Sequence, residues 1–299
     1  MRTIASMSEY TIPTEAPKTG WDMHCHTVFS DGTETPTELV RLSREKGLHG
    51  VAICDHDTTA GWQEAEQAAR TIGQPLIRGT EITAHDHGVS VHMLAYLYDP
   101  HAQHIRELFE ATRQGRLERT KRMVALMSKD LPISWDDVMA QVRQGKRTTI
   151  GRPHIADALV AAGVYQNRSE AFAGAVSSSS PYYLPTPSPT ASQVVEAIKA
   201  AGGVTVIAHA ADPGRNTHVL SDEAIKALAD QGLDGLEVWH RGNPEAARQR
   251  LLGLARQFHL LVTGGSDWHG AGKPNELGEY VTDDETVAQI AERGSIAVI

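Results

Sequence analysis

The chain has 299 residues, of which 40% are hydrophobic and 22% are charged, and its formal net charge is −9. This length allows one large α/β domain or two smaller ones, and the composition is typical of a globular protein with a buried core. The negative charge argues against broad binding to nucleic acid, so we expect no long duplex nucleic acid as a partner.

The cysteine content and the hydropathy pattern bear on location. Two cysteines, Cys25 and Cys54, are too few for a disulfide framework, which favours a reducing, cytoplasmic setting. No apolar run approaches the ~20 residues of a membrane-spanning helix, so we expect no membrane partner. Residues 1–20 lack the pattern of a signal peptide and are expected to form a loose leader.

Predicted strands and helices alternate in the first part of the chain. Strands are predicted at 21–25, 50–54, 75–82 and 89–97, where short apolar or alternating runs occur. One helix begins at Thr35, where Pro36 and Glu38 complete a capping box, and a second spans 59–72. This order is typical of a parallel α/β fold with its functional residues at one rim.

A run of helical patterns without strands then interrupts the alternation. Helices are predicted at about 101–129, 134–145, 153–162 and 169–176, and a Ser/Pro-rich stretch at 177–190 leads back. Strands return at 204–208, 235–239 and 259–263, with helices between them. We therefore predict a barrel domain of about seven strands made of residues 21–100 and 185–299, with a helical insertion, or lid, at 101–184.

Nine potential metal ligands follow, end or lie within the predicted strands. His24 and His26 are one residue apart on a strand, so both point to one side while Cys25 faces the other. A single histidine in such a place is more often a hydrogen-bonded core residue, but nine such residues are hard to obtain by chance. Imidazole and carboxylate sets suit Zn, Mn or Fe, and this number suits two or three ions with Glu81 as a bridge. The nine are His24, His26, Asp31, His56, Glu81, His92, His209, Asp267 and His269.

The other histidines lack this placement. We expect them on the surface or in packing; they are His49, His85, His87, His101, His104, His218, His240 and His259. Both cysteines are expected to be small buried apolar residues.

Six motifs in order carry a family resemblance: HCHTVFSDGT, ICDHDT, GTEI, VHMLAY, IAHAADPGR and GSDWHG. They are similar to the motifs of the PHP (polymerase and histidinol phosphatase) family of metal-dependent phosphoesterases. The resemblance implies a distorted seven-stranded α/β barrel and a trinuclear site for Mn, Fe or Zn. It implies three ligand sets: His24, His26 and Asp267 bridged by Glu81; Glu81, His92 and His209; and Asp31, His56 and His269.

The insertion after VHMLAYLYDP narrows the resemblance. It is similar to the subgroup that hydrolyses 3′,5′-nucleotide bisphosphates such as pAp, and in some members trims short RNA from the 5′ end. One departure is visible, because the family's His-Pro-Gly-Arg pattern is here interrupted by three residues between His209 and Pro213. That shift leaves the role of Arg215 open.

The predicted lid differs in charge from the rest of the chain. Residues 101–152 hold 11 Lys/Arg and 6 Asp/Glu, whereas the remainder is acidic. Such a run is often only a solvated face, but arginine is well suited to a second phosphate. Pro153 suits a helix start, where anions bind favourably, so Arg152 and His154 are the predicted substrate-binding residues.

The chemistry expected from this set needs no Ser or Cys nucleophile. Divalent ions activate a bound water and bind phosphate oxygens. Asp55 would orient a ligand histidine, or else is a helix-capping or solvated aspartate. The leading hypothesis is a phosphatase that removes the 3′-phosphate of a small bisphosphorylated nucleotide. The alternatives are a 5′→3′ exonuclease on short RNA, a histidinol-phosphate phosphatase, or a metal- or nucleotide-binding module without turnover.

Overall fold

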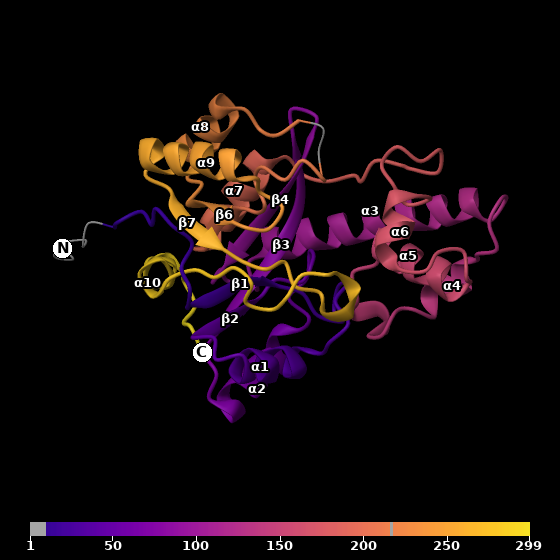
Figure 1. The fold of residues 1–299 in the computed structure, drawn as a ribbon, viewed down its shortest axis with the longest axis horizontal. Helices are drawn as coiled ribbons and strands as arrows, with labels where there is room; N and C mark the ends of the chain where they lie inside the picture. The colour runs from indigo at the N-terminus through magenta and orange to yellow at the C-terminus, as the bar shows by residue number, and fades with distance from the viewer. Residues whose placement is uncertain (1–9, 216–217) are drawn as a thin grey trace.

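The computed structural model describes residues 10–215 and 218–299, and one seven-stranded sheet organises it (Figure 1). Each strand pairs with the next in chain order. Two hydrogen bonds, from His26 N to Trp268 O (2.8 Å) and from Trp268 N to His24 O (3.2 Å), join the first strand to the chain after the last. The sheet is thus nearly closed into a barrel, as predicted. The strands are β1 (Trp21–Cys25), β2 (Gly50–Ile53), β3 (Leu76–Asp86), β4 (Val89–Tyr96), β5 (Val204–Ile207), β6 (Gly235–Trp239) and β7 (Leu261–Gly264).

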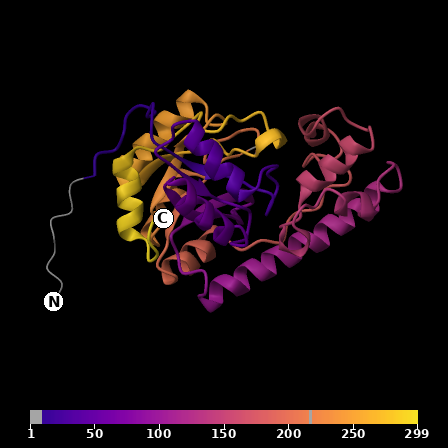
Figure 2. The ribbon, with the colours of Figure 1, turned by 90° about the horizontal axis from the view of Figure 1, so that it is seen from below.

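Helices cover the barrel and form a separate group beside it (Figures 1 and 2). Around the barrel lie α1 (Pro36–Glu45), α2 (Trp62–Ile72), α7 (Ala191–Ala200), α8 (Asp222–Asp230) and α9 (Glu245–Phe258), while α10 (Asp284–Arg293) packs against its inner apolar layer. The predicted capping box starts α1, since Glu38 N donates to Thr35 Oγ1 (3.2 Å) and Thr35 N donates to Glu38 Oε2 (2.8 Å). The lid helices are α3 (Gln103–Met127), α4 (Trp135–Met139), α5 (Arg152–Ala161) and α6 (Arg168–Ala173).

The strand β4 contradicts the expected parallel layout. It is antiparallel to both β3 and β5, whereas the other neighbouring pairs are parallel. The reason is the short turn at His87 and Gly88, because a parallel crossover needs a much longer connection. The beginning of β4 therefore lies beside the end of β3, and His92 pairs with Thr83, close to Glu81.

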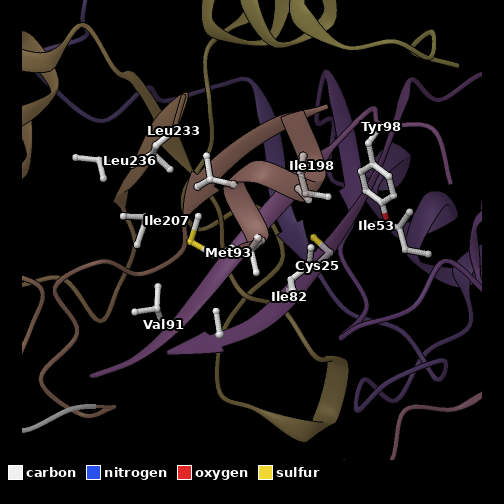
Figure 3. Close-up of a cluster of buried hydrophobic side chains, with 14 of the residues drawn as sticks. Cys25, Ile53, Ile82, Val91, Met93, Tyr98, Ile198, Ile207, Leu233 and Leu236 are labelled. Carbon is white, nitrogen blue, oxygen red and sulfur yellow. The ribbon is translucent and has the colours of Figure 1, made fainter. Parts of the chain in front are cut away.

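Alternation along the strands divides the barrel's apolar side chains into two layers. Ile53, Ile82, Met93 and Ile207 face the surrounding helices and belong to the same buried cluster as Ile198 of α7, part of which Figure 3 shows. The neighbouring residues on the strands form the other layer, inside the barrel, and residues of α10 pack with them. That inner layer includes Met23, Ala52, Cys54, Ile77, Leu94, Val206, Leu261, Val287 and Ile290. Both cysteines are free and buried, as expected.

The lid has an apolar cluster of its own. Met123 and Met127 of α3 pack with Ile155 and Leu159 of α5. The helix predicted at 134–145 is shorter than expected: α4 ends at Met139, where the next backbone bonds are the tighter i→i+3 type.

The structure of the two ends of the chain bears on the predicted leader and on the predicted set of helices. The C-terminal helix α10 was not among the predicted elements. Residues 10–20 contain no helix or strand, while the first nine residues of the predicted leader lie outside the described part. No helix in the described residues is long and apolar enough to cross a membrane.

Candidate metal centre

His24 of β1 and His26, which directly follows that strand, lie at the centre of a cluster of ligand atoms. Their Nε2 atoms are 3.1 Å apart, and both side chains are fully buried. Asp267 Oδ1 lies 3.5 Å from His24 Nε2 and 3.4 Å from His26 Nε2. Glu81 Oε2 lies 3.4 Å and 3.1 Å from the same two nitrogens. These four residues could hold one metal ion.

A second group forms around Asp31, on the loop after β1. Its Oδ1 lies 3.2 Å from His269 Nε2, and its Oδ2 lies 3.8 Å from His56 Nε2. The rings of His26 and His269 stack with centroids 4.0 Å apart. His26, Asp31, His56 and His269 could therefore hold a further ion.

Glu81 joins the first group to a third. Its Oε1 lies 2.7 Å from His92 Nδ1 and 3.0 Å from His209 Nε2. Its other oxygen lies 3.3 Å from His56 Nδ1. The antiparallel direction of β4 is what brings His92 to this point. The structure thus brings all nine predicted residues together, with Glu81 between the groups.

The cluster contains ligand atoms whose hydrogen-bonding capacity is unused. Within residues 10–215 and 218–299, five buried atoms of the predicted ligands have no hydrogen-bond partner: Asp31 Oδ1, His56 Nδ1, Glu81 Oε2, Asp267 Oδ1 and His269 Nε2. Leaving such atoms unpaired costs free energy. Imidazole nitrogens and carboxylate oxygens that converge in this way fit divalent metal ions.

Burial and charge act against each other in this cluster. Burial works against protonation of His26, but Asp267 and Glu81 outweigh it and raise its pKa to about 9. Burial and the charge of Lys273 lower the pKa of His269 to about 4. For Asp267, burial is outweighed by Lys273 and Arg215, which hold its pKa well below the usual range. The carboxylates therefore stay ionised, as metal ligands must.

Two carboxylates outside the nine predicted ligands hold the histidines in place. Glu237 of β6 is fully buried; its Oε1 lies 3.0 Å from His24 Nδ1, and its Oε2 accepts a hydrogen bond from His209 N (2.6 Å). Asp22 of β1 accepts hydrogen bonds from His24 N (3.2 Å) and Ser266 Oγ (2.6 Å). For Glu237, the sequence does carry a signal: it is the one charged residue in the otherwise apolar, buried strand GLEVW.

Asp55 has different partners from those expected. It accepts hydrogen bonds from Thr27 N (2.8 Å), Thr27 Oγ1 (2.6 Å) and Ser30 Oγ (2.7 Å). Ser30 Oγ in turn lies 3.3 Å from His26 Nδ1. Asp55 thus fixes the loop that carries Asp31 and reaches a ligand histidine through Ser30.

Three further donors face the cluster. Asp267 Oδ2 accepts hydrogen bonds from Arg215 Nη2 (2.5 Å) and Lys273 Nζ (2.8 Å), so Arg215 reaches the site despite its shifted motif. His240, expected on the surface or in packing, is 2% exposed, and its Nε2 lies 4.0 Å from Asp267 Oδ2. Its Nδ1 accepts a hydrogen bond from Gly242 N (3.0 Å), which leaves the proton of the neutral ring on Nε2.

The lid brings cations to the same edge of the barrel. Arg116 of α3 donates from Nη1 to Asp57 Oδ2 (2.9 Å) and to Thr83 Oγ1 (2.6 Å). Arg152 lies with its guanidinium carbon 5.4 Å from the Phe172 ring centroid and donates to a carbonyl oxygen of the lid. Burial lowers the pKa of Arg152, and the charges of Arg116 and Arg215 lower it further.

His154 occupies the first turn of α5, as predicted. Its Nδ1 accepts a hydrogen bond from Gly151 N (3.2 Å), and the side chain is 4% exposed. It lines a cavity of about 400 Å³ between lid and barrel, together with Asp31, Arg143 and Arg168. This cavity adjoins the cluster at Asp31.

Known proteins resemble this chain over most of its length. A 5′-3′ exoribonuclease of Haemophilus influenzae is 31% identical over 277 residues, covering 91% of this chain and 98% of the relative. A 3′,5′-nucleoside bisphosphate phosphatase of Chromobacterium violaceum is 29% identical over 255 residues, covering 84% and 88%. The crystal structure of a Bifidobacterium adolescentis protein assigned as a metal-dependent phosphoesterase has a TM-score of 0.93 and 66% identity, covering 94% of this chain and 98% of that one.

The family model for the PHP domain matches residues 22–201. That range includes β1 to β4, the lid and α7, and so contains six of the nine clustered residues. The family model, the named relatives and the buried groups of histidine and carboxylate all indicate the same family. The chain belongs to the PHP domain family and is a metal-dependent phosphoesterase, a hydrolase of phosphoric esters.

Proposed function

We propose that the protein removes the 3′-phosphate from a 3′,5′-bisphosphonucleotide such as pAp. The phosphate to be cleaved binds at the cluster, and the 5′-phosphate binds at the lid. The proposal also includes the domain division: residues 21–100 and 185–299 form the barrel, and residues 101–184 form a basic lid inserted in it.

The observation that carries the proposal is the group of arginines between lid and barrel. Arg116 reaches the barrel at Asp57 and Thr83, Arg215 reaches Asp267, and the charges of both lower the pKa of the half-buried Arg152 guanidinium. A dianionic phosphate relieves such repulsion and offers acceptors to several guanidinium groups. His154 borders the adjoining cavity and is the fourth group in this region.

We further propose that the nine clustered residues hold two or three divalent ions, for which Mn, Fe and Zn suit the ligands. When bound, such ions lower the pKa of a coordinated water and offset charge on phosphate oxygens. The chain itself holds the ligands in position: Glu237 fixes the ring of His24, and Asp55 fixes the loop of Asp31.

Residues beside the ligands act on the phosphate. Arg215 and Lys273 supply positive charge next to Asp267, and His240 presents an N–H from Nε2. Such donors stabilise the negative charge that develops on phosphate oxygens during hydrolysis. Neither cysteine takes part, because both are buried in the apolar layers of the barrel.

A 5′→3′ exoribonuclease acting on short RNA is the second candidate. The named activity of the Haemophilus influenzae relative favours it. The same site would serve, because both reactions cleave a phosphoester at the 3′ oxygen of a nucleotide that carries a 5′-phosphate.

Hydrolysis of four substrates tests the proposal, measured as phosphate release from the monoesters and as mononucleotide release from the RNA. The Mn-loaded protein is incubated with pAp, 5′-AMP, histidinol phosphate and a short 5′-phosphorylated RNA. We expect pAp to be hydrolysed with a kcat/KM at least tenfold above that of AMP, because AMP lacks the second phosphate. Equal kcat/KM values for pAp and AMP would contradict the binding of two phosphates by the site. Hydrolysis of histidinol phosphate alone would favour a histidinol-phosphate phosphatase instead.

A substitution in the lid tests the site of the second phosphate. Arg152→Ala is expected to raise KM for pAp about tenfold with a smaller change in kcat, because the 5′-phosphate is bound equally in ground and transition states. The control is Arg122→Ala, which removes an exposed arginine of α3. A loss confined to kcat would argue against this role for Arg152.

A further inference from the structure

The loop after β1, which carries the ligand Asp31, is held by the lid as well as by the barrel. From the barrel, Asp55 binds the first part of the loop, at Thr27 and Ser30. From the lid, hydrogen bonds reach the carbonyl oxygens of residues 28, 29, 31 and 33. The position of Asp31 therefore depends on two parts of the chain that lie far apart in the sequence.

The lid segment between α4 and α5 provides three of these donors. Thr149 N donates to Phe29 O (2.9 Å), and Thr148 Oγ1 donates to Val28 O (3.1 Å). Arg143 donates from Nη1 to the carbonyl oxygen of residue 33 (2.5 Å). Because backbone carbonyls accept these bonds, the lid constrains the main chain of the loop and not only its side chains.

The fourth donor is Arg168, the first residue of α6, and its bond reaches the ligand residue itself. Its Nη1 donates to Asp31 O (2.9 Å). Its Nε and Nη2 bind the two carboxylate oxygens of Asp157 on α5, at 2.7 and 2.5 Å. A bidentate pair of this kind fixes the plane of a guanidinium group. The Arg168 side chain is only 11% exposed, so it forms a rigid connection between α5 and the loop of Asp31.

Arg168 also contacts a second loop that provides a ligand to the group around Asp31. Gly272 lies three residues after His269, whose Nε2 is 3.2 Å from Asp31 Oδ1. Gly272 packs so closely against the Arg168 guanidinium that a Cβ at this position would overlap it. The two loops are joined to each other by a hydrogen bond from Thr33 N to His269 O (3.1 Å). One lid arginine thus lies against both loops.

The ligands of the first group are instead fixed from within the barrel. Glu237 binds the ring of His24, and Arg215 binds the carboxylate of Asp267. The group around Asp31 differs, because its loops are bonded and packed by the lid. Loss of a lid contact should therefore weaken one metal position and spare another.

We propose that Arg168 is a positioning residue for Asp31, through which the lid controls the binding of the divalent ion held by the group around Asp31. This proposal rests on the proposed function, because it assumes that the cluster binds more than one ion. Partners that orient a metal ligand contribute about 10- to 100-fold to metal affinity. An ion in that group also holds the lid against the loop, because coupling between two binding events is reciprocal.

Mn binding to the chelator-treated protein tests the role of Arg168. Arg168→Gln removes the guanidinium, and Gly272→Ala displaces it without changing the lid. In both variants, we expect the affinity for one ion to fall about 10- to 100-fold and that for the other ions to stay within about twofold. Isothermal titration calorimetry measures the affinities, and elemental analysis counts the ions. The controls are Arg122→Gln, at an exposed position of α3, and Gly253→Ala, at an open position of α9.

The pattern of loss distinguishes positioning from general damage. Wild-type affinities in both variants would overturn the proposal, and so would equal weakening of every ion, because that would mean that the fold as a whole is disturbed. A wild type that binds fewer than two Mn ions would refute the proposed metal centre and this inference together. Two or more ions bound equally well by wild type and variants would refute the inference alone.

Hydrogen exchange of the Thr149 amide measures the reciprocal effect on the lid. This amide donates to Phe29 O, so its exchange reports the contact between lid and loop. Mn should slow the exchange at least about fivefold in the wild type and less than about twofold in Arg168→Gln. Equal slowing in the two proteins would contradict a connection through Arg168.

Activity at two Mn concentrations separates positioning from substrate binding. Arg168 has no proposed contact with the substrate, so raising Mn about 100-fold should restore kcat/KM of Arg168→Gln to within about threefold of the wild type, by mass action. Arg152→Ala should not respond, because its proposed partner is the substrate. A loss in Arg168→Gln that persists at high Mn would overturn the positioning role.

Discussion

At the scale of single residues, Glu237 connects two ligands that come from different strands. One of its oxygens meets the ring of His24, and the other accepts the backbone N–H of His209. A carboxylate in this position fixes the orientation of a metal-binding histidine and increases its basicity. The residue therefore affects metal binding without being a predicted ligand.

Substituting this carboxylate should weaken metal binding while leaving the fold intact. Glu237→Gln keeps the shape but removes the charge, so we expect Mn affinity to fall by about 10- to 100-fold. Competition titration against a chelating dye measures the affinity, and circular dichroism checks the fold. Glu223→Gln, on the exposed side of α8, is the control. Unchanged affinity in the Glu237 variant would show that His24 needs no such partner.

The residues of the site were predictable to different degrees. The positions of His24 and His26 follow from alternation along a strand, and the ends of parallel strands explain how Asp267 joins them. His240 could not be identified in this way, because it follows β6 with the same local pattern as a packing histidine. Its approach to Asp267 depends on how β6 and the loop after β7 pack, which is a tertiary property.

At the scale of elements, Arg116 connects α3 of the lid to the loop after β2. Its partner Asp57 is fully buried, and burial raises the pKa of that carboxyl while Arg116 lowers it. The charge on Asp57 is therefore compensated by one guanidinium from another element.

Breaking this ion pair should cost more than removing it entirely. Arg116→Met leaves a buried carboxylate without its cation, so we expect the free energy of unfolding to fall by about 3 kcal/mol or more. The double variant Arg116→Met/Asp57→Asn should lose less, because no uncompensated charge remains. Urea unfolding of Arg116→Met, Asp57→Asn and the double variant, together with the wild type, forms a double-mutant cycle. Additive losses would mean that the two residues do not interact.

The helix α10 is the element that sequence patterns did not identify. It provides Val287 and Ile290 to the inner layer, whose other members come largely from strands. The helix's contribution is thus a tertiary contact at one end of the barrel. Its own apolar pattern is short, and no chemistry-bearing motif marks it.

Truncating its contact should destabilise the barrel. Ile290 is 0% exposed, so Ile290→Ala is expected to lower the free energy of unfolding by about 2 to 5 kcal/mol. Glu292→Ala on the exposed side of the same helix should change it by less than about 0.5 kcal/mol. Chemical denaturation monitored by tryptophan fluorescence measures both. Similar losses for the two variants would show that helix propensity, and not packing, is what matters.

At the scale of the whole molecule, the metal cluster links stability to pH. In the metal-free protein, neighbouring carboxylates raise the pKa of His26 to about 9. A raised pKa means that the proton stabilises the folded state: the contribution is complete below about pH 6.5 and disappears as the pH rises through 9. A bound ion takes the place of that proton.

The metal-free and metal-loaded proteins should therefore respond differently to alkali. Between pH 7 and 9, we expect Tm of the chelator-treated protein to fall more than Tm of the Mn-loaded protein. Differential scanning calorimetry in both states gives the comparison. Parallel curves over this range would contradict a proton on the cluster. His269, with its pKa lowered to about 4, is neutral throughout the range and does not contribute.

The overall architecture was largely predictable, with one exception in strand direction. Alternating apolar runs and helix caps predicted the order of strands and helices up to β7. They did not predict that β4 runs antiparallel, because direction depends on the length of the connection and not on the strand's own pattern. A two-residue turn at His87–Gly88 was the available signal.

The helix α3 determines how far the lid stands from the barrel. Near its start, His104 Nε2 lies 3.0 Å from Ala197 O of α7, and near its end Met127 enters the lid's own apolar cluster. Its 25 residues span about 37 Å. Each added or deleted turn would move the lid by about 5.4 Å. The length of this one helix thus acts as a spacer that sets how far the lid's apolar cluster stands from the barrel.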